Sequence, residues 1–401
     1  MTVRGLKIPE LRSAPLARWR WLWIPLAAFL VSRLLIFGAG IVGDTMMPTE
    51  EGHWLADADS PFLSQWTKWD SQYYVDIATN GYWFRPQRQS NVAFFPLYPM
   101  LMRVLGPYVG GVIPAGFLVS NLALLGGLIF LYLLAELETS AASAERSVFY
   151  LALFPTAFFF SCVYTESLFL LLTVGAMYFA RRRAWIPAAL LGLLASATRN
   201  LGVLTWALVM WEWLRAQGWK LTRIHTRAMW LALWSGLRKN WIEVLVIAII
   251  PLGMIAYVVF LKQNFDRPLA FIETQAAWGR QNIGPVAVIQ KSLASLAAGQ
   301  VNKGWLTQLW NTTTLLLFLL SVPLIWWKLG EGYAIYVLIM LLVPASSATG
   351  SVIRYVLTAY PAFIVLGDLI KPAWLDRAIT AAWAVLLGLF VVLFVNWIFV
   401  A

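Results

Sequence analysis

The sequence predicts an all-α membrane protein that crosses the bilayer many times. Of its 401 residues, 60% are hydrophobic and only 12% are charged, and the mean hydropathy is +0.71. A soluble domain typically carries about 25% charged residues. One protein interior cannot hide this much apolar surface, so lipid must be the solvent for much of the chain, where helices satisfy their own backbone. The composition excludes soluble enzymes, secreted disulfide scaffolds and disordered proteins.

The membrane-spanning segments follow from windows of about 20 apolar residues, the length that crosses a bilayer as a helix. Eleven windows qualify: 21–43, 112–135, 147–164, 166–180, 184–198, 201–214, 241–261, 308–327, 333–349, 352–370 and 378–400. The segment 93–105 is apolar but short and contains two prolines, so we expect it to be partly embedded. The chain shows no internal repeat. We therefore expect one transmembrane domain, 1–401, with external loops of about 44–111 and 262–307.

The basic residues predict the orientation. Five of them precede the first span: Arg4, Lys7, Arg12, Arg18 and Arg20. If this end is cytoplasmic, alternation of the spans also places the run Arg181 to Arg183 inside and the acidic start of the loop 44–92 outside, as the positive-inside rule requires. We expect a multi-pass plasma-membrane protein with a cytoplasmic N-terminus. The loop 262–307 breaks this bias with five cations, which need another explanation.

With this topology, polar residues from five segments gather on the external face. They are Lys68, Asp70 and Asp76; Glu166; Arg199 and Asn200; Glu273, Gln275, Arg280 and Gln281; and Arg354 and Tyr355. An ionised side chain costs roughly 2.5–3.5 kcal/mol at the centre of a spanning helix and less near its ends. A hydrated cavity that opens outward would keep all of these groups ionised.

The stretch 66–99 contains the most informative of these residues. Its aromatic and apolar positions 69, 73, 74, 77 and 78 follow helical spacing, and Asn80-Gly81 is a strong helix stop. This pattern predicts a short amphipathic helix on the membrane surface, with Asp70 in its first turn. A carboxylate in this aromatic setting could act as general base for a hydroxyl nucleophile. The alternative is that Asp70 only caps the helix.

Several runs of this chain together resemble one enzyme family. They are WDSQYYVDIATNGY, AFFPLYP, LFPTAFFFSCVYTESLF, ASATRNLG and IRYVLTAYPAF. In this order they resemble segments of the glycosylphosphatidylinositol (GPI) mannosyltransferase II (PIG-V-like) family, within the type C (GT-C) glycosyltransferase superfamily. The resemblance covers about 66–365. The short loops are typical of a prokaryotic member, so the acceptor need not be the eukaryotic glycolipid.

The resemblance implies a fold and a reaction. The fold is a GT-C type helical bundle with amphipathic helices in its first external loop. The reaction moves mannose from a polyprenyl-phosphate-mannose donor to a hydroxyl of a glycolipid or glycan on the extracytoplasmic face, with inversion. The family uses an acidic residue of the first external loop as base, and the match assigns this role to Asp70. Membrane lipids are the other expected partners; nucleic acid is not one.

The remaining candidates would bind the substrates. Arg199, Arg280 and Arg354, with Lys68 as a weaker candidate, could hold the donor phosphate, because guanidinium groups match phosphate oxygens. Alternatively these cations pair with lipid headgroups or carboxylates. Glu166 could hold an arginine or a sugar hydroxyl. The sugar site could be lined by Tyr73, Tyr74, Gln275 and Trp278, and Trp69 and Tyr355 are further substrate-binding candidates. Ordinary interfacial aromatic packing is the alternative for the aromatic members of this set.

We expect no cofactor and no metal. The chain has one cysteine, Cys162, and two distant histidines, His53 and His225, which makes a His-rich site unfavourable. Asp57 and Asp59 form a DxD pattern that could bind a divalent ion on a diphosphate, but the expected donor is a monophosphate.

Two other functions compete with this prediction. One is a related transferase for another polyprenyl-phosphate sugar. The other is a lipid or sugar transporter, a class that often shows inverted repeats and charges near the membrane midplane. Only Arg33, near the middle of the first span, is clearly deep in the membrane, where it could pair with an acid or reach a cavity.

Overall fold

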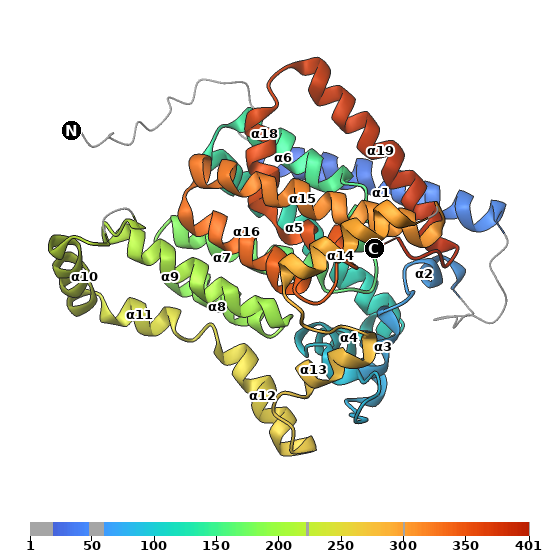
Figure 1. Ribbon diagram of the computed structural model, residues 1–401, viewed down its shortest axis with the longest axis horizontal. Coiled ribbons are helices and arrows are strands. Elements are labelled where there is room, and N and C mark those ends of the chain that lie inside the picture. Colours follow the sequence, from blue (N-terminus) through green and yellow to red (C-terminus); the bar gives the residue numbers. More distant parts are fainter. Residues whose placement is uncertain (1–18, 48–59, 222–223, 300, 401) are drawn as a thin grey trace.

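The computed structural model describes residues 19–47, 60–221, 224–299 and 301–400. Within these ranges all regular structure is helical, which confirms the predicted all-α class. Figure 1 shows a bundle of helices from which α8 to α12 extend along one side. The DxD pattern at Asp57 and Asp59 lies outside the described residues.

Among the described residues, four helices are long and apolar enough to cross a membrane: α1 (Arg20–Met46), α5 (Val112–Glu138), α15 (Lys303–Leu329) and α19 (Ala373–Val395). Two bent pairs raise this number to six within the described ranges: α11 (Trp241–Ile247) with α12 (Leu252–Phe265), and α17 (Val352–Tyr355) and η7 (Val356–Thr358) with α18 (Tyr360–Leu369). The predicted number of about eleven spans is therefore not confirmed.

The other predicted windows fall on shorter helices. These are α6 (Ala141–Leu153), α7 (Glu166–Arg181), α8 (Trp185–Ser196), α9 (Leu204–Ala216) and α16 (Glu331–Ala345). At a rise of about 1.5 Å per residue, helices of this size reach only about 18–24 Å, less than the roughly 30 Å hydrocarbon layer. Irregular segments extend several of them: η3 (Ala157–Phe160) follows α6, and η4 (Asn200–Val203) precedes α9.

Proline residues mark both bends. Pro251 immediately precedes α12, whose axis departs from that of α11 by 46°. Pro361 lies in the first turn of α18, which turns by 77° from the preceding segment. Proline lacks a backbone N–H and clashes with the preceding turn, so a helix breaks before it and restarts at it. In α17, before the second bend, Val352, Ile353 and Arg354 are buried.

The first and last described spans lie side by side. α1 packs along α19, and the Asn396 side chain donates to the carbonyl of Gly43 at 3.1 Å. A β-carbon at Gly43 would lie 3.0 Å from the Val395 side chain and 3.1 Å from the Val392 backbone. Glycine therefore permits this close helix contact, as small residues do between membrane helices. The contact holds the C-terminal segment next to Trp69, whose ring packs against Trp397 and Phe399.

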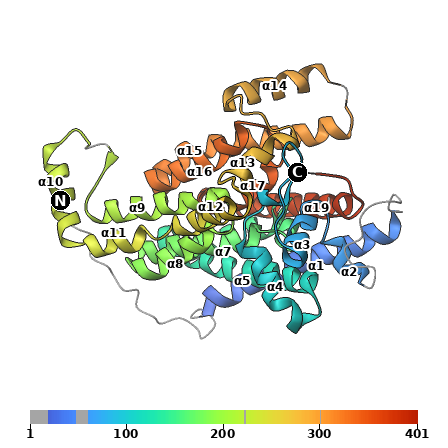
Figure 2. The same cartoon turned by 90° about the horizontal axis from the view of Figure 1, so that it is seen from below.

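Short helices form within the two segments that the sequence predicts to be external loops. They are α2 (Pro61–Gln65), α3 (Ser71–Asn80), η2 (Asn91–Ala93), α4 (Leu97–Val109), α13 (Ala270–Glu273), η6 (Thr274–Trp278) and α14 (Pro285–Ala298). The predicted helix after Trp69 is confirmed as α3, which ends at Asn80 before Gly81. Figure 2 shows α14 standing apart from the bundle, while α10 (Arg227–Lys239) lies at the other end of the molecule.

Candidate active site

A cavity of about 370 Å³ opens where the segments predicted to be external meet. Nine of the residues predicted from the sequence line it: Asp70, Tyr74, Glu166, Arg199, Gln275, Trp278, Arg280, Arg354 and Tyr355. They come from α3, α7, the turn before η4, the loop around η6, and α17. Widely separated parts of the chain thus supply one polar cavity.

Asp70 is positioned by a tight turn before α3. Trp69 has a φ of 55°, in the left-handed region that few bulky residues adopt. The hydroxyl of Tyr164 stabilises this turn, because it accepts from the Asp70 backbone N–H at 3.1 Å and donates to the Lys68 carbonyl at 3.0 Å. Although Asp70 is the residue before α3, its side chain makes no capping hydrogen bond. The carboxylate is thus free to face the cavity.

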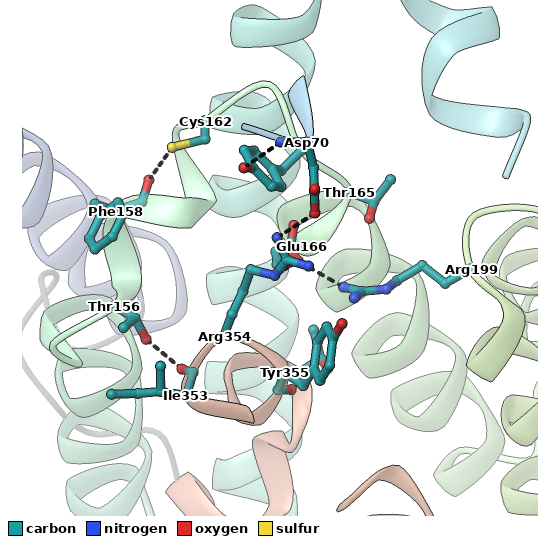
Figure 3. A network of polar contacts seen from close by, with 12 residues as sticks. Asp70, Thr156, Phe158, Cys162, Thr165, Glu166, Arg199, Ile353, Arg354 and Tyr355 are labelled. Carbon is teal, nitrogen blue, oxygen red and sulfur yellow. Dashed lines mark hydrogen bonds and ion pairs between the residues drawn. The ribbon is translucent and has the colours of Figure 1, made fainter. Parts of the chain in front are cut away.

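Asp70 belongs to a buried network of ion pairs (Figure 3). Arg354 Nη1 lies 2.9 Å from Asp70 Oδ2, and its Nε lies 3.4 Å from Glu166 Oε1. The same Glu166 oxygen accepts from Arg199 Nη1 at 3.0 Å. Glu166 and Arg354 are 1% and 7% exposed at their side chains, whereas Asp70 is 31% exposed. Among the network's acids, Asp70 is therefore the one that a substrate can reach.

A second group of contacts surrounds the Tyr355 ring. The guanidinium carbons of Arg199 and Arg354 lie 5.4 Å and 5.3 Å from its centroid. Arg280 donates to the Tyr355 hydroxyl at 3.1 Å and to Gln275 Oε1 at 3.3 Å. The Tyr355 hydroxyl raises the pKa of Arg280, against burial, which lowers it. Three guanidinium groups and two carboxylates thus line one cavity, which leaves an excess of positive charge suited to an anion.

The segment that presents Tyr164 and Glu166 is irregular and fully buried. After η3 the chain turns toward α7, and Arg33 of α1 supports this turn by donating to Ser161 Oγ at 2.5 Å and to the Ala157 carbonyl at 3.3 Å. The deep arginine in the first span therefore binds backbone and hydroxyl oxygens in this segment. Thr156 ties the same segment to α17 through the Ile353 carbonyl at 2.7 Å.

Three sequence candidates lie beside the cavity without lining it. Trp69 packs against the C-terminal segment, and Lys68 lies with its Nζ 4.5 Å from the Trp397 ring centroid. Lys68 is only 4% exposed, and burial lowers its pKa to about 8, against Asp44, which raises it. Tyr73 stacks on Phe94 at 4.7 Å and donates to Gln89. These three support the walls of the cavity.

The structure adds cavity residues that sequence reasoning did not single out as candidates. They are Ala93, Phe94, Phe95, Tyr164, Thr198, Phe271, Ala348, Gly350, Ser351 and Phe399, and Asn200 of the predicted polar set lines the cavity as well. Phe94 and Phe95 lie within the run AFFPLYP, and Tyr164 lies within LFPTAFFFSCVYTESLF. The resemblance of these runs to the family could therefore have pointed to the three residues. Phe399 has no such signal, because only the packing of α19 against α1 brings it to the cavity. No group of three or more His, Cys, Asp or Glu side chains that could hold a metal occurs in the described ranges.

Curated relatives match part of the chain. "GPI mannosyltransferase 2" of Schizosaccharomyces pombe is 28% identical over 197 residues, which cover 45% of this chain and 41% of the relative. "GPI alpha-1,6-mannosyltransferase 2" of Homo sapiens is 30% identical over 154 residues, which cover 35% of this chain and 30% of the relative. The chain thus aligns with less than half the length of these relatives.

Solved structures resemble the chain over most of its length. ArnT from Cupriavidus metallidurans, bound to undecaprenyl phosphate, has a TM-score of 0.49 at 14% identity, covering 89% of this chain and 60% of that one. The oligosaccharyltransferase of Archaeoglobus fulgidus has a TM-score of 0.46 at 12% identity, covering 96% and 56%.

The family itself is settled by a broader match. The family model for Mannosyltransferase (PIG-V) matches residues 48–264, which is more than half of the chain and includes Asp70, Glu166 and Arg199. This match confirms the resemblance recognised in the sequence runs. The chain is a multi-pass membrane protein that belongs to the Mannosyltransferase (PIG-V) family.

Proposed function

We propose that this protein is a membrane glycosyltransferase that moves mannose from polyprenyl-phosphate-mannose to a hydroxyl of a glycolipid or glycan. The proposal draws on the family match, on the names of the relatives, and on the chemistry of the cavity. The site would face the extracytoplasmic side, because the positive-inside pattern assigns the N-terminus to the cytoplasm. Asp70 would be the general base.

The guanidinium groups would bind the donor phosphate. Arg199, Arg280 and Arg354 converge on Tyr355, and together they exceed the charge of Asp70 and Glu166. A phosphate diester carries one negative charge, and a further charge develops on it as the sugar leaves. Preorganised cations stabilise this growing charge in a buried site more strongly than water does. The donor phosphate would therefore compete with Asp70 for Arg354.

That competition links donor binding to the base. With Arg354 drawn to the phosphate, the Asp70 carboxylate loses its ion-pair partner and becomes available to the acceptor. The acceptor O–H would then give its proton to Asp70 while its oxygen forms a bond to mannose C1. The bond from C1 to the phosphate oxygen breaks at the same time, and the electron pair leaves with polyprenyl phosphate. Attack from the opposite face inverts the anomeric configuration.

One observation carries this proposal: the partly exposed Asp70 carboxylate lies 2.9 Å from a buried guanidinium in a cavity with excess positive charge. A carboxylate that merely capped α3 would bond to backbone N–H groups, and Asp70 does not. A carboxylate beside several guanidinium groups suits a reaction in which a base acts next to a bound phosphate.

The test is sugar transfer by the purified protein in lipid nanodiscs. Labelled polyprenyl-phosphate mannose, glucose and arabinose would each be incubated with the enzyme and a lipid extract, and the products identified by mass. We expect product only with the mannose donor. Product from another sugar would favour the related transferase, and movement of the donor across the bilayer with no product would favour a transporter.

Asp70→Asn tests the base directly. We expect a fall in rate of roughly 10²–10⁴-fold, the usual contribution of a general base, with the Kd for polyprenyl phosphate kept or lowered because Arg354 is released. The control is Asp266→Asn, an exposed carboxylate in the left-handed conformation that asparagine tolerates. An Asp70→Asn enzyme with normal kcat would contradict the assignment.

A further inference from the structure

A second cavity, of about 550 Å³, adjoins the first one at its far wall. It lies among the start of α15, the segment before α17 and the end of the chain, and its lining is Lys303, Gly304, Thr307, Gln308, Asn311, Thr349, Gly350, Asn396, Trp397, Ile398 and Phe399. Gly350 and Phe399 line both cavities. None of the residues assigned to the base or to the donor phosphate lines this second cavity.

The turn that presents Asp70 forms part of the boundary between the two cavities. The Trp69 ring packs edge-on against Trp397 at 5.5 Å and against Phe399 at 5.0 Å. The next residue, Asp70, lines the first cavity. On the other side, Asn311 accepts from the Ile353 backbone N–H at 3.1 Å, immediately before Arg354. The base and its arginine thus both lie next to residues of the second cavity.

The second cavity differs from the first in its chemistry. Its described lining offers hydroxyl and amide groups and a single ammonium group, with no carboxylate and no guanidinium. Asn396 Oδ1 is buried and has no hydrogen-bond partner among the described residues. Trp397 and Phe399 add flat apolar faces. Neutral hydroxyl groups satisfy amides and hydroxyls well, whereas a phosphate would gain far more from the three arginines.

We propose that the second cavity binds the acceptor, through a neutral, hydroxyl-rich sugar ring, and delivers one hydroxyl past Phe399 to Asp70. This inference rests on the proposed function and adds to it the substrate class of a separate site. The donor enters the arginine cavity and the acceptor enters the amide cavity. The two substrates meet where Gly350 and Phe399 join the two spaces.

The test fills the second cavity alone. A β-carbon at Gly304 would meet only Asn302 Oδ1 within 4 Å, at 3.4 Å, so the side chain of Gly304→Leu enters the cavity without displacing backbone. The control is Gly388→Leu, whose β-carbon meets nothing within 4 Å and which lies outside both cavity linings. The probe is methyl α-D-mannopyranoside, with binding measured by saturation-transfer NMR in nanodiscs. The Kd of a polyprenyl phosphate is measured in parallel.

We expect the wild type and Gly388→Leu to bind the mannoside saturably, and Gly304→Leu to bind it at least about tenfold more weakly, a loss of about 1.4 kcal/mol. Binding of polyprenyl phosphate should be equal in all three proteins. Three results would overturn the inference: no saturable mannoside binding by the wild type, undiminished binding by Gly304→Leu, or equal loss of both ligands in that variant. Mannoside binding without sugar transfer would instead contradict only the proposed function.

Discussion

Asp70, which immediately precedes α3, and Asp76, which lies within α3, have different partners although they are close in the sequence. Asp76 accepts from Trp83 Nε1 at 2.6 Å and from Asn91 Nδ2 at 2.9 Å, so it closes its own loop. Asp70 instead reaches across the molecule to Arg354. Local donors satisfy the Asp76 carboxylate. The Asp70 carboxylate is paired with Arg354, a cation that could bind a substrate anion instead. The residue that can change its partner is the better candidate for catalysis.

Tyr164 is the residue on which the position of Asp70 depends. Tyr164→Phe removes two hydrogen bonds that hold the left-handed turn at Trp69, at a cost of about 0.5–1.5 kcal/mol each. If the carboxylate shifts by about 1 Å, kcat should fall by up to about 100-fold, with little change in the Kd for polyprenyl phosphate. Steady-state kinetics and donor binding would measure both effects.

The matched control for this change is Tyr360→Phe. The Tyr360 hydroxyl is buried in α18 and has no hydrogen-bond partner among the described residues, so its removal should leave kcat unchanged. A Tyr164→Phe enzyme as active as Tyr360→Phe would show that the hydroxyl does not position the base.

At the scale of elements, the end of α3 sets where the segment between α1 and α4 turns back. Gly81 has a φ of 90° and a ψ of −167°, a conformation that is essentially restricted to glycine. A β-carbon there would meet nothing within 4 Å, so the restriction comes from the backbone alone. The chain after Gly81 runs back toward η2, where Asn91 donates to the Gly81 carbonyl at 3.0 Å. The loop thus folds on its own helix.

Gly81→Ala should therefore lower the free energy of unfolding by about 1–3 kcal/mol through backbone strain. Gly388→Ala, in the interior of α19 where the added methyl also meets open space, should instead raise it by about 0.5–1 kcal/mol because alanine favours a helix. Thermal unfolding in detergent would compare the two variants. Equal stability of both would mean that the turn at residue 81 is relaxed.

At the scale of the whole molecule, α3, in the loop predicted to be external, and α10 lie at opposite ends of the bundle, as both ribbon views show (Figures 1 and 2). Thr79 on α3 and Ser235 on α10 are both exposed. In a Cys162→Ser background, Thr79→Cys should react with an impermeant maleimide added outside intact cells. Ser235→Cys should react only after the membrane is opened. The reverse labelling pattern would place the candidate active site in the cytoplasm.

The sequence by itself determined the class of the protein, the end of α3 and the charged residues that line the candidate site. The apolar composition predicts that much of the chain lies in lipid. The helical spacing before Asn80-Gly81 predicts the local helix α3, and the sequence runs identify the family. These signals are local, so one sequence is enough to read them. The predicted count of about eleven spans is not confirmed, because hydropathy windows do not register breaks, such as those at Pro251 and Pro361, or the length of each helix.

Only the tertiary structure decided which partners meet. Asp70 and Arg354 are separated by 284 positions in the chain, and no periodicity links them. Tyr164 reaches the Asp70 turn because Arg33 and Thr156 hold an irregular segment in place, and Phe399 reaches both cavities because α19 packs on α1. Such contacts depend on how helices pack and on where backbone breaks direct the chain. The energy of each contact depends on two residues that are far apart in the sequence, so a local sequence pattern does not predict which residues pair.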